Sequence, residues 1–252
     1  MAFYTDAEAL NNNCGSSQVI SLLIASFCLG DTIYNAMQEQ NILDKIMQNH
    51  LDLLEALYSQ RAIRYFKDQD IPNEIIYRLI EIATKAPSGG NSQPWRFLVI
   101  KNQDVKNEIG KLYLQSWNQA YGSGSNEGRN LEQKIMTSAS YLAENIAKAP
   151  VWVMACLNHD GSDSHMGRGA SIYPAVQNFL LGCMEFGLGS VITTLHKRYE
   201  KEVKELLNIP DNTETAALLP LGYLDEKVNY GPTKREPVNQ ITYQDSWGNP
   251  FK

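Results

Sequence analysis

The chain has 252 residues, a formal net charge of -6, and 43% hydrophobic and 20% charged residues. This composition is ordinary for a globular protein with one large domain or two small ones. The acidic balance argues against nucleic-acid and anionic-membrane partners, because both are bound through basic surfaces.

The cysteines and histidines show neither a metal-ligand nor a disulfide pattern. None of the four cysteines has C-x-x-C spacing, and some of them, such as Cys156 and Cys183, lie in apolar runs. We therefore expect reduced thiols and no metal site. The longest apolar run, residues 19–29, is too short to cross a bilayer, and no basic residue precedes it as in a signal peptide. These features predict a cytoplasmic protein without a membrane span.

Residues 1–46 differ in composition from the rest, with Lys45 as their one cationic residue and many amide and hydroxyl side chains. Three interpretations stay open: one or two amphipathic helices, a poorly ordered extension, or a working chain that begins near Met47. We treat residues 1–46 as an atypical extension and residues 47–252 as one domain.

From residue 48 onward, helical and strand patterns alternate. The spacing predicts helices over 48–58, from 73 onward, 104–120, 131–149, 171–186 and 200–208. Short runs predict strands over 96–101, 151–157, 190–194 and 216–223. Loops are expected at 122–128 and 159–169, and Asp104 is the expected N-cap of its helix. Helices that alternate with single strands indicate an α/β or α+β domain.

Two of these segments carry further expectations. The helix over 171–186 is apolar nearly all round, which is typical of a helix buried on all sides, either centrally or at a subunit interface. The tail after residue 224 is rich in proline and polar residues, and Trp247 is its one large expected anchor.

The run from Ala86 to Trp95 contains more proline, glycine and polar residues than a simple turn needs. Pro87 and Pro94 restrict the backbone at both ends, whereas the glycines between them allow positive φ and close approach of a ligand. The run also holds serine, asparagine and glutamine side chains, which offer donors and acceptors in one short arc. This composition favours a ligand-binding loop over a plain polar connection.

Two pairs of basic residues could bind an anion. Arg61 and Arg64 lie within one turn after the first expected helix, and Lys234 and Arg235 lie near the other end of the chain. Guanidinium groups suit phosphate because they can donate two parallel hydrogen bonds. Taken alone, either pair is better explained as solvated surface charge.

Together these segments resemble the nitroreductase family of flavin enzymes, in the family's order and spacing and over roughly residues 47–248. The matching segments are 60–66, 86–95, 169–178, 186–189, 206–210, 221–223 and 234–237. The resemblance implies an α+β fold with a central, mostly antiparallel sheet flanked by helices, in an intertwined homodimer. The commoner family form Arg-Arg-Ser-x-Arg is altered here, because Gln60 replaces its first Arg and Ala62 its Ser.

The resemblance also implies a site for flavin mononucleotide (FMN). The phosphate would lie against Arg61, Ala62, Arg64 and Arg235. The ring and ribityl chain would meet Pro87, Ser88, Gly89, Asn91 and Gln93 from one subunit. Tyr173, Pro174 and Gln177 would border the same pocket across the dimer interface, and backbone N–H groups of Thr193, Thr194 and Leu195 would reach flavin N5. No side chain is expected to be catalytic, since the flavin carries the chemistry.

The implied activity is hydride transfer from NADH or NADPH through FMN to a small flat acceptor such as a nitroaromatic, a quinone or an enone. The alternatives are a reductive dehalogenase or flavin-cleaving relative of the same fold, and a flavin carrier without enzymatic activity. Iodotyrosine deiodinases use a lid with a Glu-x₃-Tyr-x₃-Lys pattern, which residues 113–129 do not show.

Overall fold

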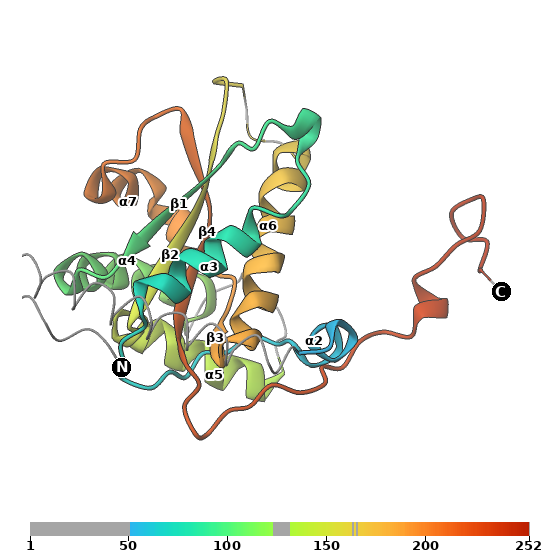
Figure 1. Ribbon diagram of the computed structural model, residues 1–252, viewed down its shortest axis with the longest axis horizontal. Helices are drawn as coiled ribbons and strands as arrows, with labels where there is room; N and C mark the ends of the chain where they lie inside the picture. The colour runs from blue at the N-terminus through green and yellow to red at the C-terminus, as the bar shows by residue number, and fades with distance from the viewer. Residues whose placement is uncertain (1–50, 123–131, 163, 165, 252) are drawn as a thin grey trace, which may run out of the picture. The chain divides into compact units, whose positions relative to one another are not determined.

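The computed structural model describes residues 51–251 except 123–131, 163 and 165 (Figure 1). The expected extension over residues 1–46 and most of the expected loop over 122–128 therefore lie outside the described residues. Among the residues described, no helix is long and apolar enough to cross a membrane.

The centre of the fold is a four-stranded antiparallel sheet in the order β1-β2-β4-β3. Its strands are β1 (Trp95–Ile100), β2 (Val151–Asn158), β3 (Leu188–Ser190) and β4 (Thr213–Tyr223). This confirms the antiparallel α+β prediction. The third strand was misplaced at 190–194: it ends at Ser190, and of the residues that follow only Thr193 pairs with β4, in an isolated bridge to Leu218.

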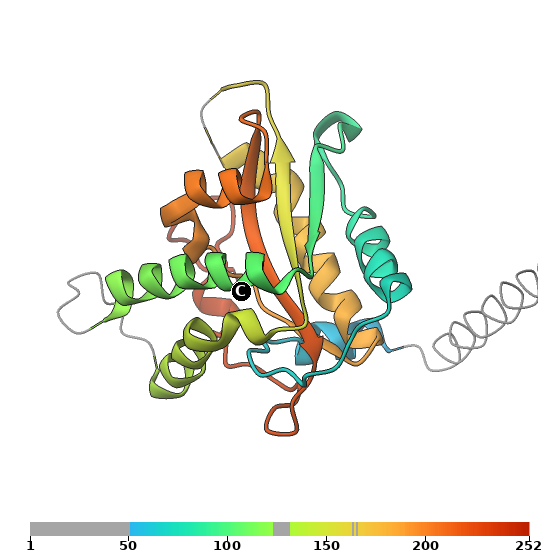
Figure 2. The ribbon, with the colours of Figure 1, turned by 90° about the vertical axis from the view of Figure 1, so that its left-hand side faces the viewer.

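Helices cover both faces of the sheet (Figure 2). They are α2 (Leu53–Ser59), α3 (Asn73–Ala83), α4 (Gln103–Tyr121), α5 (Gln133–Asn145), α6 (Met166–Glu185) and α7 (Glu200–Leu207). Short 3₁₀ turns are η1 (Gly89–Asn91), η2 (Ile146–Lys148), η3 (Leu195–Tyr199) and η4 (Val238–Gln240). The cap of α4 is Asn102, whose side chain accepts from the Val105 N–H at 3.1 Å, so the Asp104 prediction was wrong.

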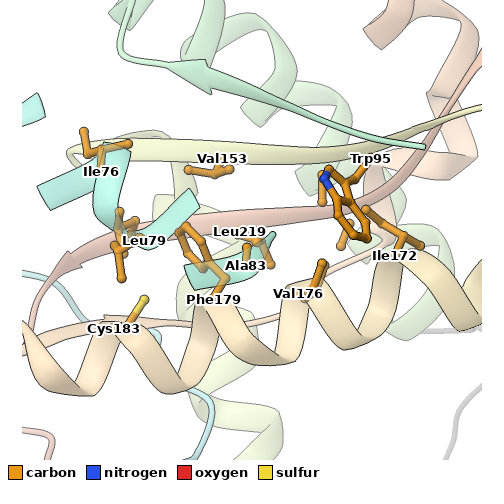
Figure 3. Close-up of a cluster of buried hydrophobic side chains, with 14 of the residues drawn as sticks. Ile76, Leu79, Ala83, Trp95, Val153, Ile172, Val176, Phe179, Cys183 and Leu219 are labelled. Atoms are coloured by element: carbon orange, nitrogen blue, oxygen red, sulfur yellow. The ribbon is translucent and has the colours of Figure 1, made fainter. Parts of the chain in front are cut away.

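Each face of the sheet has its own hydrophobic core, because alternate β2 side chains point in opposite directions. Val153 faces α3 and α6, where Leu79 and Phe179 meet it, as Figure 3 shows. Trp152 and Met154 face the opposite core, which α4 and α5 complete. Both β2 faces are fully buried, and this explains the unbroken apolar run in the strand.

Within one chain helix α6 is not buried on all sides, so the expectation of a central helix was wrong, and the alternative of a subunit interface stays a prediction. It starts at Met166, five residues before the expected 171. Its inner stripe, including Ala175 and Phe179, is fully buried, whereas the Tyr173 side chain is 43% exposed and Gln177 is exposed. A solvent-facing stripe thus runs along the longest helix.

After β4 the chain passes α2, where the Gly231 N–H donates to the Ser59 carbonyl at 2.9 Å, and then leaves the body of the fold (Figure 1). Trp247 does not anchor this tail, since it is 89% exposed and packs only against Tyr243 of the same tail among the aromatic rings described, with ring centroids 4.7 Å apart and the rings tilted by 40°. Val238 and Phe251 are also exposed, at 72% and 57%.

Candidate active site

A close backbone contact places the predicted arginines beside the sheet. The Ile63 N–H donates to the Ser190 carbonyl at 3.0 Å, and the Ile63 side chain is buried against Gly189. A Cβ atom at Gly189 would lie 2.5 Å from Ile63 Cγ2, so only glycine lets the two segments approach this closely. Arg61 and Arg64, on either side of Ile63, are thereby held at the end of β3.

The two guanidinium groups form a positive cradle without a carboxylate partner. Arg64 is half-buried, and its Nη1 donates to Ser138 Oγ at 3.2 Å. Burial lowers the pKa of Arg64, and nearby Arg61 lowers it further. Within the described part of the chain, neither arginine forms an ion pair with a carboxylate. A half-buried cation with a like-charged neighbour and a neutral partner has the character of an oxyanion site.

Tyr113 connects this cradle to the segment after β3, and no pattern in the sequence marks it. Its hydroxyl lies 2.6 Å from Thr193 Oγ1, and burial raises its pKa to about 12, so it stays neutral. Tyr113 also lies near Arg64. Ser138, the Arg64 partner, was missed as well: both residues lie in ordinary helical patterns, where no spacing marks them as functional.

Of the three backbone positions predicted to meet a ligand, Thr193 is already engaged. Its N–H donates to the Leu218 carbonyl at 3.1 Å, and its carbonyl accepts from the Leu218 N–H at 2.9 Å. Thr194 is exposed and Leu195 is half-buried at the start of η3. Thr193 therefore supports the site through the sheet, and Thr194 and Leu195 carry the backbone groups that a ligand could reach.

A cavity of about 430 Å³ opens beside η3, between β4 and the first half of α6. Leu157, Ile172 and Ala216 form apolar parts of its lining, and Lys197 and Tyr173 contribute polar groups. Its size falls within the usual range of small-molecule sites. Predicted residue Pro174, about two turns into α6, has no N–H to offer the Ala170 carbonyl, and Ala170 also lines the cavity.

The loop from Pro87 to Gln93 is strained. Gly90, Asn91 and Gln93 have φ values of 58°, 53° and 49°, in the left-handed region that favours glycine. The Gln93 N–H donates to Ser88 Oγ at 3.1 Å, and Gln93 Nε2 donates to Asn91 Oδ1 at 3.2 Å. Strained backbone with exposed polar side chains is characteristic of binding loops. Gly89 is exposed and meets no neighbouring atom.

Within one chain the strained loop and the arginine cradle lie at opposite ends of the sheet. The loop leads into Trp95, which pairs with Leu157 at one end of β2, whereas Ser190 adjoins Leu221, the partner of Val151 at the other end. Six residues of strand separate these ends, roughly 20 Å at about 3.3 Å per residue.

The remaining predicted residues divide between these ends or lie apart from both. Trp95 packs beside Ile172 and Val176 of α6 (Figure 3), so the strained loop adjoins the half of α6 that carries Tyr173, Pro174 and Gln177. Ala62 lies with the arginines and packs against the second core. Arg235 is exposed in the tail, and its Nη1 donates to the Lys234 carbonyl at 3.0 Å.

Residues 57–223 match the model of the nitroreductase family. The chain is 29% identical over 201 residues, 78% of its length, to 99% of an Archaeoglobus fulgidus protein provisionally named an NADH dehydrogenase/NAD(P)H nitroreductase. It is 28% identical to an iodotyrosine deiodinase of Thermotoga neapolitana, over 75% of this chain and 95% of that protein.

Solved structures show the same fold. The structure of an oxidized iodotyrosine deiodinase bound to FMN and 3-iodo-L-tyrosine is similar with a TM-score of 0.62 and 26% identity, over 77% of this chain and 99% of that one. An FMN- and NADPH-dependent nitroreductase, NfnB from a Sphigopyxis strain, is similar with a TM-score of 0.61 and 20% identity, over 78% of this chain and 100% of that one.

Proposed function

Because this chain belongs to the nitroreductase family, we propose that it is an FMN-dependent oxidoreductase that transfers electrons from NADH or NADPH to a small flat acceptor. Nitroaromatics, quinones and enones are the acceptor classes we propose. The observation that carries the proposal is the pair Arg61 and Arg64, two guanidinium groups with no carboxylate partner among the described residues. A phosphate would supply the negative charge that this half-buried pair lacks.

Each part of the proposed site has a separate task. Arg64 and Arg61 would hold the phosphate, with Ala62 beside them and Arg235 added from the tail. Bound FMN would supply the electron transfer itself. Thr194 and Leu195 would present backbone N–H groups to the ring, and the cavity beside η3 would receive the acceptor against its apolar lining.

We further propose that the working unit is a homodimer with sites built from both chains. The strained loop, with Pro87, Ser88, Gly89, Asn91 and Gln93, lies roughly 20 Å along the sheet from the arginine cradle of its own chain. A second chain could bring its loop to that cradle. The exposed stripe of α6 with Tyr173 and Gln177 and the apolar tail residues supply surfaces for the contact.

Purification and reduction test the flavin proposal directly. The protein, purified or reconstituted with FMN, should be yellow and release FMN on denaturation, and NADH or NADPH added without oxygen should bleach the flavin band. Bleaching followed by reoxidation with a quinone or nitroaromatic supports the reductase. An FMN-loaded protein that neither nicotinamide bleaches would be a flavin carrier, or an enzyme with another reductant.

Subunit mixing tests the shared site. An Arg64→Gln chain lacks part of the cradle, and a chain with Asn91→Ala and Gln93→Ala lacks the loop side chains. If each site uses both chains, the mixed dimer has one intact and one doubly altered site. In the mixed dimers FMN binding should therefore recover to about half of the wild-type stoichiometry, which is about a quarter over a random equimolar mixture that also contains both parent dimers. No recovery in confirmed mixed dimers, or a monomer that binds FMN fully, would contradict the shared site.

Reductive dehalogenation is the second candidate, because several relatives are named iodotyrosine deiodinases and share up to 28% identity with this chain. Release of iodide from 3-iodotyrosine, with dithionite as reductant, would favour this reaction. Formation of flavin fragments under oxygen would instead indicate a flavin-cleaving relative. For either activity we propose a cytoplasmic location, which the buried free thiols Cys156 and Cys183 favour, and a flavin domain over residues 47–252.

A further inference from the structure

We propose that His196, Lys197, Glu200 and Thr215 form a polar clamp that fixes the backbone of Thr194 and Leu195 and so sets the redox potential of the flavin. This inference rests on the proposed function, in which those two backbone N–H groups face the ring. The four clamp residues would be positioning residues, since none of them is proposed to touch the cofactor. Their contacts join η3 and α7 to the uncovered part of the β4 edge.

The centre of the clamp is Thr215. Its hydroxyl donates to Glu200 Oε1 at 2.6 Å, and its backbone N–H donates to the same oxygen at 2.9 Å. His196, whose side chain is fully buried, places Nε2 3.1 Å from the Thr215 hydroxyl. Because that hydroxyl donates to the carboxylate, it accepts from His196, and this assigns the Nε2–H tautomer.

Lys197 closes the clamp from the other side. Its Nζ donates to the Thr215 carbonyl at 2.7 Å and lies 3.2 Å from Glu200 Oε2. The β2–β4 register shifts at Ala155 and Cys156, so that Ala216 is an extra residue on β4. Such bulges often occur beside active sites, where they redirect side chains. Next to this bulge β4 no longer pairs with β3. At this point side chains from η3 and α7 form hydrogen bonds with Thr215 of β4.

The segment between the two anchor points is short. Thr193 is bound to β4 through both its N–H and its carbonyl, and His196 and Lys197 are bound to Thr215. Only Thr194 and Leu195 lie between these anchors. Their backbone is therefore held at both ends by the same strand, as a preorganised donor requires.

The clamp also contains a feature that stability alone does not explain. His196 Nδ1 is buried and has no hydrogen-bond partner within the described structure. An unsatisfied buried polar atom costs free energy, and such atoms in native proteins call for a functional or structural reason. A histidine retained here despite that cost is consistent with a role in holding η3.

The test compares Thr215→Val, which removes the hydroxyl at nearly constant volume, with Thr215→Ser, which keeps it. A fixed N–H dipole near the ring stabilises the electron-rich reduced flavin. Thr215→Val should therefore bind oxidised FMN within about twofold of wild type but lose about tenfold in preference for reduced FMN. For a two-electron couple this lowers the midpoint potential by about 30 mV. Thr215→Ser should restore the wild-type potential.

Two further measurements separate positioning from stability. Val203→Ala shortens a fully buried side chain on α7 without touching the clamp, so it should lower the melting temperature and leave the potential unchanged. Amide hydrogen exchange of the peptide over residues 193–199, measured without FMN, should accelerate in Thr215→Val. Because exchange needs no cofactor, it reports on the clamp even where a variant binds flavin poorly.

The outcomes are distinct. Faster exchange with a lowered potential, rescued by Thr215→Ser, supports the inference. A wild-type potential in FMN-loaded Thr215→Val, or an equal shift in Val203→Ala, overturns the inference and leaves the proposed function in place. Unchanged exchange overturns the clamp itself. A wild-type protein that takes up no FMN overturns the proposed function together with this inference.

Discussion

Replacement of Arg64 by glutamine should separate cofactor affinity from folding stability. Among the described residues the guanidinium makes one hydrogen bond, to Ser138, and the stabilisation from that bond is opposed by burial of the charge and by the nearby charge of Arg61. Removing the charge should therefore change the free energy of unfolding by no more than about 1 kcal/mol. For a domain of this size, that corresponds to about 2–4 °C in melting temperature.

The loss in FMN affinity should be much larger. A charge-assisted hydrogen bond contributes about 1.5–3 kcal/mol, which corresponds to a roughly 10- to 150-fold increase in the Kd for FMN. Fluorescence titration of FMN gives the Kd, and a thermal melt of the flavin-free protein gives the stability.

Arg78→Gln is the matched control, because it removes the same net charge from an exposed site where Arg78 pairs with Glu81 at 2.6 Å. It should leave the Kd unchanged. If Arg64→Gln binds FMN as tightly as the wild type, or if both variants weaken it equally, the cradle is not the phosphate site. A drop in stability of several kcal/mol without FMN would show that Arg64 serves folding instead.

Three further predictions concern the surroundings of this cradle. Gly189→Ala should lower the free energy of unfolding by about 1–3 kcal/mol in urea titrations, because the added Cβ would press on Ile63. It should also weaken FMN binding, since Ile63 lies between the two arginines. Unchanged FMN affinity would refute the dependence of the arginine positions on Gly189. Gln93→Gly should weaken FMN binding but leave the free energy of unfolding unchanged or raise it by up to about 1 kcal/mol, since glycine accepts the φ of 49° without strain. A strongly destabilised variant would show that the backbone at Gln93 is not strained. Burial lowers the pKa of His196 to about 4. Between about pH 6.5 and pH 4, His196 is therefore protonated in the unfolded chain and neutral in the folded chain. Stability should therefore fall by about 2 kcal/mol from pH 7 to pH 5, and a His196→Gln variant that keeps the same slope in urea midpoints would contradict this assignment.

The sequence predicted those elements whose pattern comes from burial. In β2, side chains on both faces enter a core, which produces the apolar run that marked residues 151–157. The strand β3 has no such pattern, because it is only three residues long. Its central residue is Gly189, because the side chain of Ile63 lies too close for any Cβ atom there. The start of α6 was missed for a similar reason. Its first turn is held by Arg168, which contacts Glu214 and Ser162, and these contacts leave no pattern in the local sequence.

The candidate site was predicted in part. Arg61 and Arg64 were found because the resemblance marked them, whereas Tyr113 and Ser138 come from helices whose inward faces read as ordinary packing. On helical spacing alone, Glu200 would pair with Lys204 one turn later on its own helix. In the structure it accepts from Thr215 and lies 3.2 Å from Lys197, contacts that only the fold brings together.

Three features of the described residues oppose folding stability, two of them in the proposed site and the third in the clamp that supports it. The cradle of Arg61 and Arg64 has like charges side by side, the loop at Gln93 holds a left-handed backbone, and His196 has an unsatisfied buried nitrogen. Local rules of folding are most often broken where function needs them to be. The cradle and the loop lie roughly 20 Å apart along the sheet of one chain. At this distance the two features cannot contact the same part of one small ligand within a single chain. A ligand shared between two chains would account for both, because it would neutralise the charge at one end and use the strained loop of the partner at the other.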